Sequence, residues 1–373
     1  MSARRALVIS HPAVVSVNQV VYRELGRRGW QLTVVVPSRW RHSYSPQQVT
    51  PQALEGMQQA LRPTRVAFAG RPQRHVYLTR ARSICRSLRP DVGFIEAEPY
   101  SFPALQWSLA FKRQVIPFGV HCFENIDRPL PYPVERARSL VLRDAAFVAA
   151  RSQSAARLVS SWGARGEVGL APPAVPAWPE ASHAHTARPF TVGYAGRLVA
   201  SKGLTDLLAA VRKLSAPVEL LMIGDGELRG QLEGEPIPGS KLRVLDSLSH
   251  AQMADGYAQL DVLVLPSRTT RTWKEQFGRV IVEALSCGVP VIGSDSGEIP
   301  WLIELTGGGV VFPEGDSDAL AAALNRLRDA PELRASLASS GRAAVERMFS
   351  VPAATDALEQ LLLGAIARRA TSR

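Results

Sequence analysis

Residues 273–292 constrain the fold more than any other stretch of the chain. Their pattern predicts a loop, a helix, a tight turn and a buried strand, in that order. The predicted helix ends at Gly288, and Pro290 prevents it from continuing. Residues 289–292 form a short apolar run, typical of a parallel strand covered on both faces. The apolar stripe of the helix consists of Val280, Ile281, Ala284 and Leu285. This stretch therefore predicts one helix–strand step of a parallel α/β sheet.

Two glutamates lie on either side of the predicted helix start. Glu275 and Glu283 are eight residues apart, and eight helical steps would separate them by roughly 12 Å. That separation matches the span from a sugar to a ribose across a diphosphate. Phe277 and Gly278 precede Arg279 at the expected helix start, where free N–H groups and the positive helix end favour an anion. The pattern predicts a nucleotide-sugar site; the alternative is an amphipathic helix with two solvated glutamates.

At these residues the sequence resembles the Glu-x7-Glu motif of the family-4 retaining glycosyltransferases. The resemblance implies the GT-B fold, an α/β architecture of two Rossmann-like doubly wound domains facing across a cleft. It also implies a C-terminal helix that crosses back to the first domain. Gln276 departs from the family, which often has glycine or proline at this position. The donor-binding residues implied in this stretch are Glu275, Phe277, Gly278, Arg279 and Glu283, with Glu275 also catalytic.

A second group of candidates precedes this stretch. A predicted strand at 190–195 runs into Gly196 and Arg197, and Lys202 follows ahead of a helix that begins near Leu204. Two cations and a glycine at such a place suit a diphosphate leaving group. The resembled family uses an arginine and a lysine here for that purpose. We therefore expect Gly196 to bind the donor, and Arg197 and Lys202 to be donor-binding and catalytic.

Two loops of the second half complete the expected donor site. The resemblance implies that the nucleotide base lies at the turn 246–248, which includes Leu248. The base would be held there largely by backbone groups. The side chains there do not reveal which base is bound. Residues 268–274 are longer than the link usual in the family, and we expect them to form a lip over the sugar pocket.

The first half begins with a β-α-β pattern. Strands are predicted at 6–10 and 32–36, with a helix at 18–28 between them. Ligands of such a unit lie at the carboxyl ends of its strands. The first loop lacks the paired glycines often found in the family, and we expect its Ser16 to cap the helix or to lie near the acceptor. Residues 38–64 predict an irregular excursion with at most one helix. Further strands are predicted at 65–68, 92–95, 115–120 and 146–149.

Polar residues follow two of these strands. His121 comes directly after the apolar strand 115–120, where the family has a histidine that faces the donor sugar. The resemblance implies that His121 is catalytic, and the alternative is a structural histidine. Glu96 and Glu98 follow the strand 92–95, and Glu124 follows His121. We place Glu96 and Glu124 on the acceptor side.

A proline-rich stretch divides the chain. Proline has no backbone N–H to donate to a helix or a sheet. The prolines in residues 172–188 therefore predict an extended linker. We expect an acceptor-binding domain at 1–171 and a nucleotide-sugar-binding domain at 189–350. Residues 351–373 are expected to form the helix that packs back on the first domain.

Charge is unevenly distributed along the chain. The net charge is +11, and residues 1–150 hold 21 of the 44 Lys and Arg but only 9 of the 33 Asp and Glu. Such an excess suits an anionic partner, either a phospholipid surface or a lipid-linked phosphate, with nucleic acid less expected. The alternative is an ordinary solvated surface.

Cysteine content and hydropathy indicate a cytoplasmic setting. Three scattered cysteines have no metal-ligand spacing and predict reduced thiols. No signal peptide and no membrane-spanning stretch is expected.

Together these features predict a retaining, metal-independent glycosyltransferase of polysaccharide or glycolipid assembly. Its expected donor is a UDP- or GDP-linked sugar, and no cofactor or metal is expected. The acceptor would be a glycan or a lipid-linked molecule, reached from the inner face of the plasma membrane. The alternatives are a GT-B sugar-nucleotide epimerase and a non-catalytic GT-B binding protein.

Overall fold

The structure is a computed structural model that describes residues 3–41, 48–180, 188–250 and 252–371. The chain divides into two compact units. Unit 1 consists of Met1–Ala174 and Val351–Arg373, and unit 2 consists of Val175–Ser350. The division after Ala174 falls inside the proline-rich stretch 172–188.

Unit 1 is built on a seven-stranded sheet with the order β11-β10-β9-β8-β1-β2-β5. All its neighbouring strands pair in parallel. The strands are β1 (Arg5–Ser10), β2 (Gln31–Pro37), β5 (Leu61–Thr64), β8 (Val92–Glu96), β9 (Phe118–Cys122), β10 (Phe147–Ala150) and β11 (Glu167–Leu170). The helices are α1 (Val20–Arg27), α2 (Ala81–Leu88), α3 (Phe102–Arg113), α4 (Tyr132–Asp144) and α5 (Gln153–Ser161). The chain first winds outward from β1 through β2 and then returns to the other side of β1 as β8, so the strand order reverses between β1 and β8.

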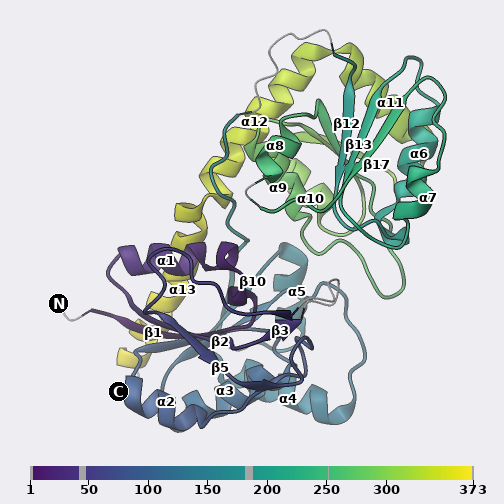
Figure 1. Cartoon of the computed structure of the whole chain (residues 1–373). Coiled ribbons are helices and arrows are strands. Elements are labelled where there is room, and N and C mark those ends of the chain that lie inside the picture. The colour runs from purple at the N-terminus through teal and green to yellow at the C-terminus, as the bar shows by residue number, and fades with distance from the viewer. Residues whose placement is uncertain (1–2, 42–47, 181–187, 251, 372–373) are drawn as a thin grey trace. The chain divides into compact units, whose positions relative to one another are not determined.

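Unit 2 repeats this plan with a six-stranded parallel sheet, ordered β14-β13-β12-β15-β16-β17. Its strands are β12 (Thr191–Ala195), β13 (Glu219–Ile223), β14 (Lys241–Leu245), β15 (Val262–Leu265), β16 (Val291–Ser294) and β17 (Gly309–Phe312). Its helices are α6 (Leu204–Arg212), α7 (Arg229–Glu233), α8 (Met253–Tyr257), α9 (Arg279–Ser286), α10 (Ile299–Thr306), α11 (Ser317–Asp329) and α12 (Pro331–Phe349). Figure 1 shows α6 and α11 on one face of the sheet and α9 and α12 on the other. Here the order reverses between β12 and β15.

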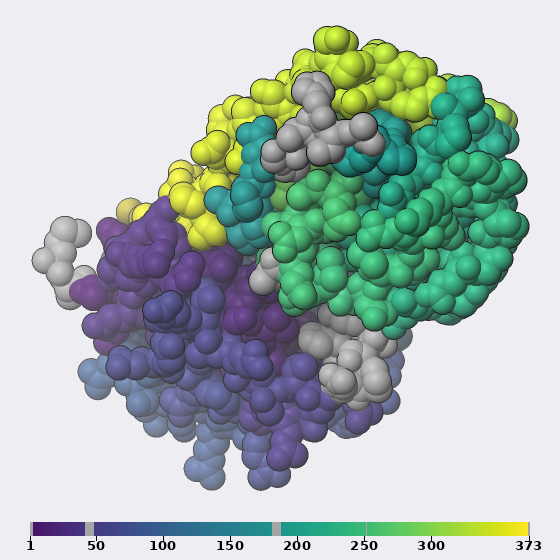
Figure 2. Space-filling view, turned by 45° about the horizontal axis from the view of Figure 1, so that its top comes forward, coloured from purple at the N-terminus to yellow at the C-terminus, as the bar shows by residue number. Residues whose placement is uncertain are grey.

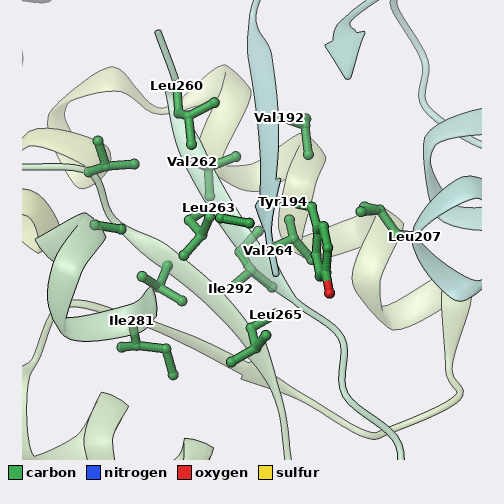
Figure 3. Packing of buried hydrophobic residues seen from close by; sticks show 14 of the residues in the cluster. Val192, Tyr194, Leu207, Leu260, Val262, Leu263, Val264, Leu265, Ile281 and Ile292 are labelled. Carbon is green, nitrogen blue, oxygen red and sulfur yellow. The ribbon is translucent and has the colours of Figure 1, made fainter. Parts of the chain in front are cut away.

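The core of unit 2 explains why its strands have nearly continuous apolar runs. Side chains of β12, β15, β16 and α9 pack together, and Figure 3 shows Tyr194, Leu263, Ile281 and Ile292 in this cluster. All four are fully buried. A sheet covered by helices on both faces leaves no solvent face, so polar residues do not alternate with apolar ones.

The C-terminal helix α13 (Val351–Thr371) packs in unit 1, against α1 and beneath the central strands. Its buried side chains include Leu358, Leu361 and Leu362, which join the apolar cluster of β1 and β8. Figure 2 shows the yellow C-terminal residues against the purple N-terminal ones. The expectation that the last helix returns to the first domain is therefore confirmed.

The excursion after β2 differs from the prediction in one respect, because β5 (Leu61–Thr64) at its end is a strand of the main sheet. It holds no helix among its described residues, but two short antiparallel pairs, β3 (Trp40–Arg41) with β4 (Gln48–Val49) and β6 (Val66–Ala67) with β7 (Val76–Tyr77). Residues 65–68 were expected as a strand of the main sheet, but β5 occupies that edge instead. β5 contains Pro63, and an edge strand tolerates proline because one side of its backbone has no ladder partner.

Candidate functional site

In both units the polar candidates gather where the strand order reverses. In open parallel sheets ligands bind outside the carboxyl ends of the strands at this switch point. In unit 2 the switch point lies between β12 and β15, followed by Gly196–Arg197 and by Pro266–Ser267. In unit 1 it lies between β1 and β8, which end in Ser10 and Glu96.

The centre of the unit 2 site is an ion pair between Lys202 and Glu275. Lys202 Nζ donates to Glu275 Oε2 over 2.6 Å, and the two side chains are only 12% and 11% exposed. Ser267 Oγ donates to the same oxygen over 2.9 Å. Lys202 Nζ also lies 4.6 Å from the centre of the Trp273 ring. The two residues expected to hold phosphate and sugar therefore contact each other.

The backbone of Glu275 is held against the turn before α10. Glu298 donates its backbone N–H to the Glu275 carbonyl oxygen over 3.1 Å. Gly297 has a φ of +59°, and a Cβ atom there would lie 2.0 Å from the same oxygen. Only glycine fits this close approach. The turn between β16 and α10 thus positions the backbone of Glu275 directly.

Helix α9 begins at Arg279, the helix start expected from the sequence. Gly278 is its N-cap, with a φ of +75° and no side-chain cap. Glu275 is therefore outside the helix, so its separation from Glu283 is not set by eight helical steps. The uncapped N–H groups of the first turn remain suited to an anion, as expected.

Glu283 is buried within a polar cluster on α9. Its Oε1 accepts from Arg279 Nε over 2.7 Å, and its Oε2 accepts from Tyr257 over 2.8 Å. Burial raises the pKa of Glu283 above its ordinary value, while Arg279 and the hydrogen bonds oppose that rise. His250 Nε2 lies 3.4 Å from an Arg279 guanidinium nitrogen. These contacts hold Glu283 in one orientation at the end of the first turn.

The other donor-site candidates differ in accessibility. Arg197 is exposed, and its carbonyl oxygen accepts from the Tyr194 hydroxyl over 2.7 Å. Leu248 is half-buried beside α8. Phe277 is buried, and its ring packs edge-on against Phe349 at 5.9 Å. Phe277 thus belongs to the core, and only its backbone is placed to meet a ligand.

The expected lip at 268–274 is anchored to unit 2 at its first residues. Arg268 forms a bidentate ion pair with Asp206, and Arg268 N donates to the Ser201 carbonyl oxygen over 2.9 Å. Thr269 N donates to Glu314 over 2.7 Å. This segment brings Trp273 to Lys202.

In unit 1 a buried cluster of hydrogen bonds lies at the switch point. Ser10 Oγ and the Tyr22 hydroxyl donate to Glu96 Oε2 over 2.5 and 2.6 Å. Burial raises the pKa of Glu96, and these hydrogen bonds and the charge of Arg151 partly offset the rise. Ser10 and Glu96 are directly paired in the β1–β8 register.

His121 lies at the carboxyl end of β9, next to β8. It is 4% exposed, and neither ring nitrogen hydrogen-bonds to a described residue. Its ring lies 4.0 Å from that of Phe123 and 6.1 Å from that of Phe94. Burial, and then the charge of Arg151, lower the pKa of His121 well below its ordinary value. The imidazole is therefore neutral at physiological pH.

Two further glutamates lie beside His121. Glu98 Oε1 accepts from Phe123 N over 2.8 Å, and burial raises the pKa of Glu98 to about 7. Glu124 accepts from the backbone N–H groups of Asn125 and Ile126 and from the Tyr100 hydroxyl. Glu96, Glu98, His121 and Glu124 are thus all buried, at or just after the carboxyl ends of β8 and β9.

Ser16 does not cap α1. The N-cap is Gln19, without a side-chain hydrogen bond, and Ser16 begins a 3-10 turn (Ser16–Gln19). Ser16 is therefore separated from the start of α1 by this turn. The apolar periodicity of the sequence does not reveal the turn.

Several residues of both sites escaped the sequence analysis. Ser267 could have been found, because it is the first polar residue after β15. Tyr257, Tyr22 and Arg151 gave no signal, since each reaches its partner from a distant element. Trp273 lies in the expected lip, but its contact with Lys202 was not predicted.

Among the described residues, no three His, Cys, Asp or Glu side chains are grouped as metal ligands. No helix in the described part of the chain is long and apolar enough to cross a membrane. The three cysteines are free thiols and buried.

Comparison with solved structures identifies the fold. The chain resembles sucrose-phosphate synthase from Thermosynechococcus elongatus with a TM-score of 0.73 at 17% identity, over 98% of this chain and 100% of that one. It resembles Anabaena HepE, solved in complex with UDP, with a TM-score of 0.70 at 18% identity, over 96% and 99%. The fold is GT-B. The expected pair of Rossmann-like domains is thereby confirmed.

Comparison with protein families concerns unit 2. Residues 180–344 match the family described as glycosyl transferases group 1. This range contains Arg197, Lys202, Glu275 and Glu283, and it ends within α12. The match supports the resemblance drawn from the sequence at the level of group 1 glycosyltransferases.

Curated relatives match over less than half of this chain. One is a GDP-mannose-dependent monoacylated α-(1-6)-phosphatidylinositol monomannoside mannosyltransferase of Corynebacterium glutamicum, 33% identical over 41% of this chain and 42% of that protein. Another is the lipopolysaccharide core biosynthesis glycosyltransferase LpsE of Rhizobium meliloti, 32% identical over 45% and 48%. The matched segments thus span about half or less of these relatives' own lengths.

Proposed function

We propose that the chain is a retaining glycosyltransferase that moves a sugar from a nucleoside-diphosphate sugar to a glycan or lipid-linked acceptor. The Lys202–Glu275 pair at the β12/β15 switch point, beside the uncapped start of α9, is the observation that carries this proposal. It joins a cation and a carboxylate where a diphosphate and a sugar would meet. The match of residues 180–344 to group 1 glycosyl transferases supports it.

The residues of unit 2 would stabilise the leaving diphosphate. Arg197 and Lys202 would bind its oxygens, and the first-turn amides of α9 would add fixed dipoles. Glu275 would bind sugar hydroxyls, and Glu283 the ribose hydroxyls. We propose that these groups suffice without a metal ion.

The chemistry would proceed on one face of the sugar. The acceptor hydroxyl forms the new bond to the anomeric carbon while the bond to the diphosphate oxygen breaks, and the leaving phosphate takes the hydroxyl proton. The configuration is thereby retained. The unit 1 residues Glu96 and Glu124 would face the acceptor, with His121 toward the donor sugar.

UDP- and GDP-linked sugars are the donors we propose, because similar proteins are described with each. The HepE structure holds UDP, and the Corynebacterium relative is GDP-mannose-dependent. Two relatives are named for lipopolysaccharide core and glycolipid assembly, which favours a lipid-linked or glycan acceptor. We propose that the enzyme works in the cytoplasm at the inner face of the membrane, attracted by the basic first half.

The test is turnover of a panel of UDP- and GDP-sugars by the purified chain, with and without glycan acceptors. Slow hydrolysis of one donor, with transfer when an acceptor is added, supports the proposal. Conversion of a donor to its epimer without an acceptor would identify an epimerase instead. Nucleotide binding without turnover across the panel would indicate a non-catalytic binding protein.

A further inference from the structure

A cavity of about 550 Å³ lies in unit 1 at the edge strands β2 and β5. It is lined by Ser38, Arg39, Gln48, Arg65, Val66 and Ala69. Ser38 and Arg65 are the first residues after the two strands, whose last residues, Pro37 and Thr64, are paired in register. Ser38 N donates to the Thr64 carbonyl oxygen over 2.8 Å. The cavity therefore lies at the carboxyl edge of the sheet, the edge at which ligands of parallel sheets bind.

The two arginines of this cavity have no acidic partner in the described part of the chain. Neither Arg39 nor Arg65 forms an ion pair with any residue that the structure describes. The surrounding stretch explains why, since residues 39–89 hold ten arginines and one acid, Glu55. By comparison, Arg28 of the same unit lies 2.6 and 2.8 Å from carboxylate oxygens of Asp356 and Glu359. The positive charge at the cavity is thus left for a ligand.

The lining matches the chemistry of a phosphate site. Guanidinium groups bind phosphate oxygens with paired, charge-assisted hydrogen bonds, and a serine hydroxyl and a glutamine amide can add further donors. The volume lies within the range of small-molecule sites, about 300 to 1,000 Å³. An uncharged sugar would leave two guanidinium groups without counter-charge in a concave site.

We propose that Arg39 and Arg65 bind a phosphoryl group of the acceptor in this cavity. The inference rests on the proposed function for the role of the ligand as acceptor, and on the cavity itself for its chemistry. The phosphoryl group belongs to a lipid headgroup or to a water-soluble phosphorylated acceptor. Two exposed apolar residues are connected to the lining through the backbone: Phe68 precedes Ala69 in the chain, and Leu78 N donates to the Arg65 carbonyl oxygen over 2.8 Å.

The test compares three forms of the full chain. One is the wild type, one is the double variant Arg39→Gln/Arg65→Gln, and the matched control is Arg62→Gln/Arg86→Gln. The control removes two exposed arginines of the same stretch that do not line the cavity. Binding of inorganic phosphate is titrated by calorimetry at constant ionic strength. We expect the cavity variant to bind at least about tenfold more weakly than the wild type, because hydrogen bonds to charged groups are strong, with the control within about twofold.

A second arm distinguishes the two sources of the phosphoryl group. The three proteins are sedimented with phosphatidylcholine vesicles that contain or lack phosphatidylglycerol. A lipid source predicts binding to the anionic vesicles that the cavity variant loses and that inorganic phosphate displaces. A soluble source predicts the same loss of phosphate binding, with vesicle binding equal in the cavity variant and the control.

Equal phosphate affinity in all three proteins would overturn the inference and leave these arginines as solvated surface. Nucleoside-diphosphate binding to unit 2 is measured in the same variants. Its retention in the cavity variant separates a failure of this inference from a failure of the proposed transferase function.

Discussion

Lys202 Nζ and Glu275 Oε2 lie 2.6 Å apart, across the point where β12 and β15 diverge. Each neutralises the other, and Ser267 adds a hydrogen bond to the carboxylate. A diphosphate that binds Lys202 must therefore compete with Glu275 for the ammonium. The pair is nearly buried, so removal of one partner leaves an unpaired charge in a region of low dielectric.

Glu275→Ala is expected to lower transfer at least about tenfold, or roughly 1.4 kcal/mol, because the sugar loses its carboxylate partner. The matched variant Glu275→Gln keeps the shape and one acceptor oxygen, and should lose less. Initial rates with the donor found in the panel measure both, with circular dichroism to verify folding. A folded Glu275→Ala variant with wild-type turnover would show that Glu275 does not contribute to transfer.

Arg197→Ala and Lys202→Ala are expected to weaken binding of the nucleoside diphosphate more than binding of the free nucleoside, because both cations are placed for phosphate. Calorimetric titration with the two ligands measures the difference. Arg212→Ala, an exposed arginine on α6 that pairs with Glu235, is the control. Equal losses for nucleoside and diphosphate would show that the two cations act elsewhere.

Removal of divalent metal is expected to leave transfer intact. Arg197, Lys202 and the amides of α9 would supply the positive field that a metal supplies in other transferases. Rates are measured after dialysis against a chelator and again after addition of Mg²⁺ or Mn²⁺. A complete loss that the metal restores would contradict the metal-free mechanism.

His121→Ala is expected to lower transfer at least about tenfold while the affinity for the nucleoside diphosphate stays within about twofold. The diphosphate contacts proposed lie in unit 2, and His121 belongs to unit 1. Because its pKa is well below the ordinary value, the rate should not depend on its titration between pH 6.5 and 8. A parallel loss of nucleotide affinity would point to a structural role.

Glu98→Gln is expected to flatten the dependence of stability on pH. Burial raises the pKa of Glu98 from 4.5 to about 7, so the folded chain holds a proton that the unfolded chain releases between these values. The free energy of unfolding of the wild type should therefore fall, relative to the variant, as the pH rises from about 4.5 to 7. The change is on the order of 3 kcal/mol at 1.36 kcal/mol per pKa unit.

Denaturant titrations of the wild type and Glu98→Gln at several pH values measure this difference. Glu55→Gln, an exposed glutamate of the same unit, is the control and should follow the wild type at every pH. A wild-type curve parallel to that of Glu98→Gln would show that Glu98 does not titrate in this range.

The sequence by itself determined the two parallel α/β sheets and indicated most residues of the proposed donor site. Apolar runs such as those of β12 and β16 are local signals, because a strand covered on both faces must be apolar throughout. Arg197, Lys202 and Glu275 were found because each follows a strand or precedes a helix start, which is also a local property.

Only the tertiary structure decided which of these residues meet. Lys202 and Glu275 are 73 residues apart in the chain, and the order of β12 and β15 in the sheet brings them together. The partners of Glu283 and Glu96, namely Tyr257 and Tyr22, come from other helices. The cavity at Arg39 and Arg65 depends on β5 at the sheet edge, where a proline-containing strand gave no periodic signal. Periodicity reports which face of an element is buried, whereas side-chain pairing depends on strand order, and strand order is set by packing across the whole sheet.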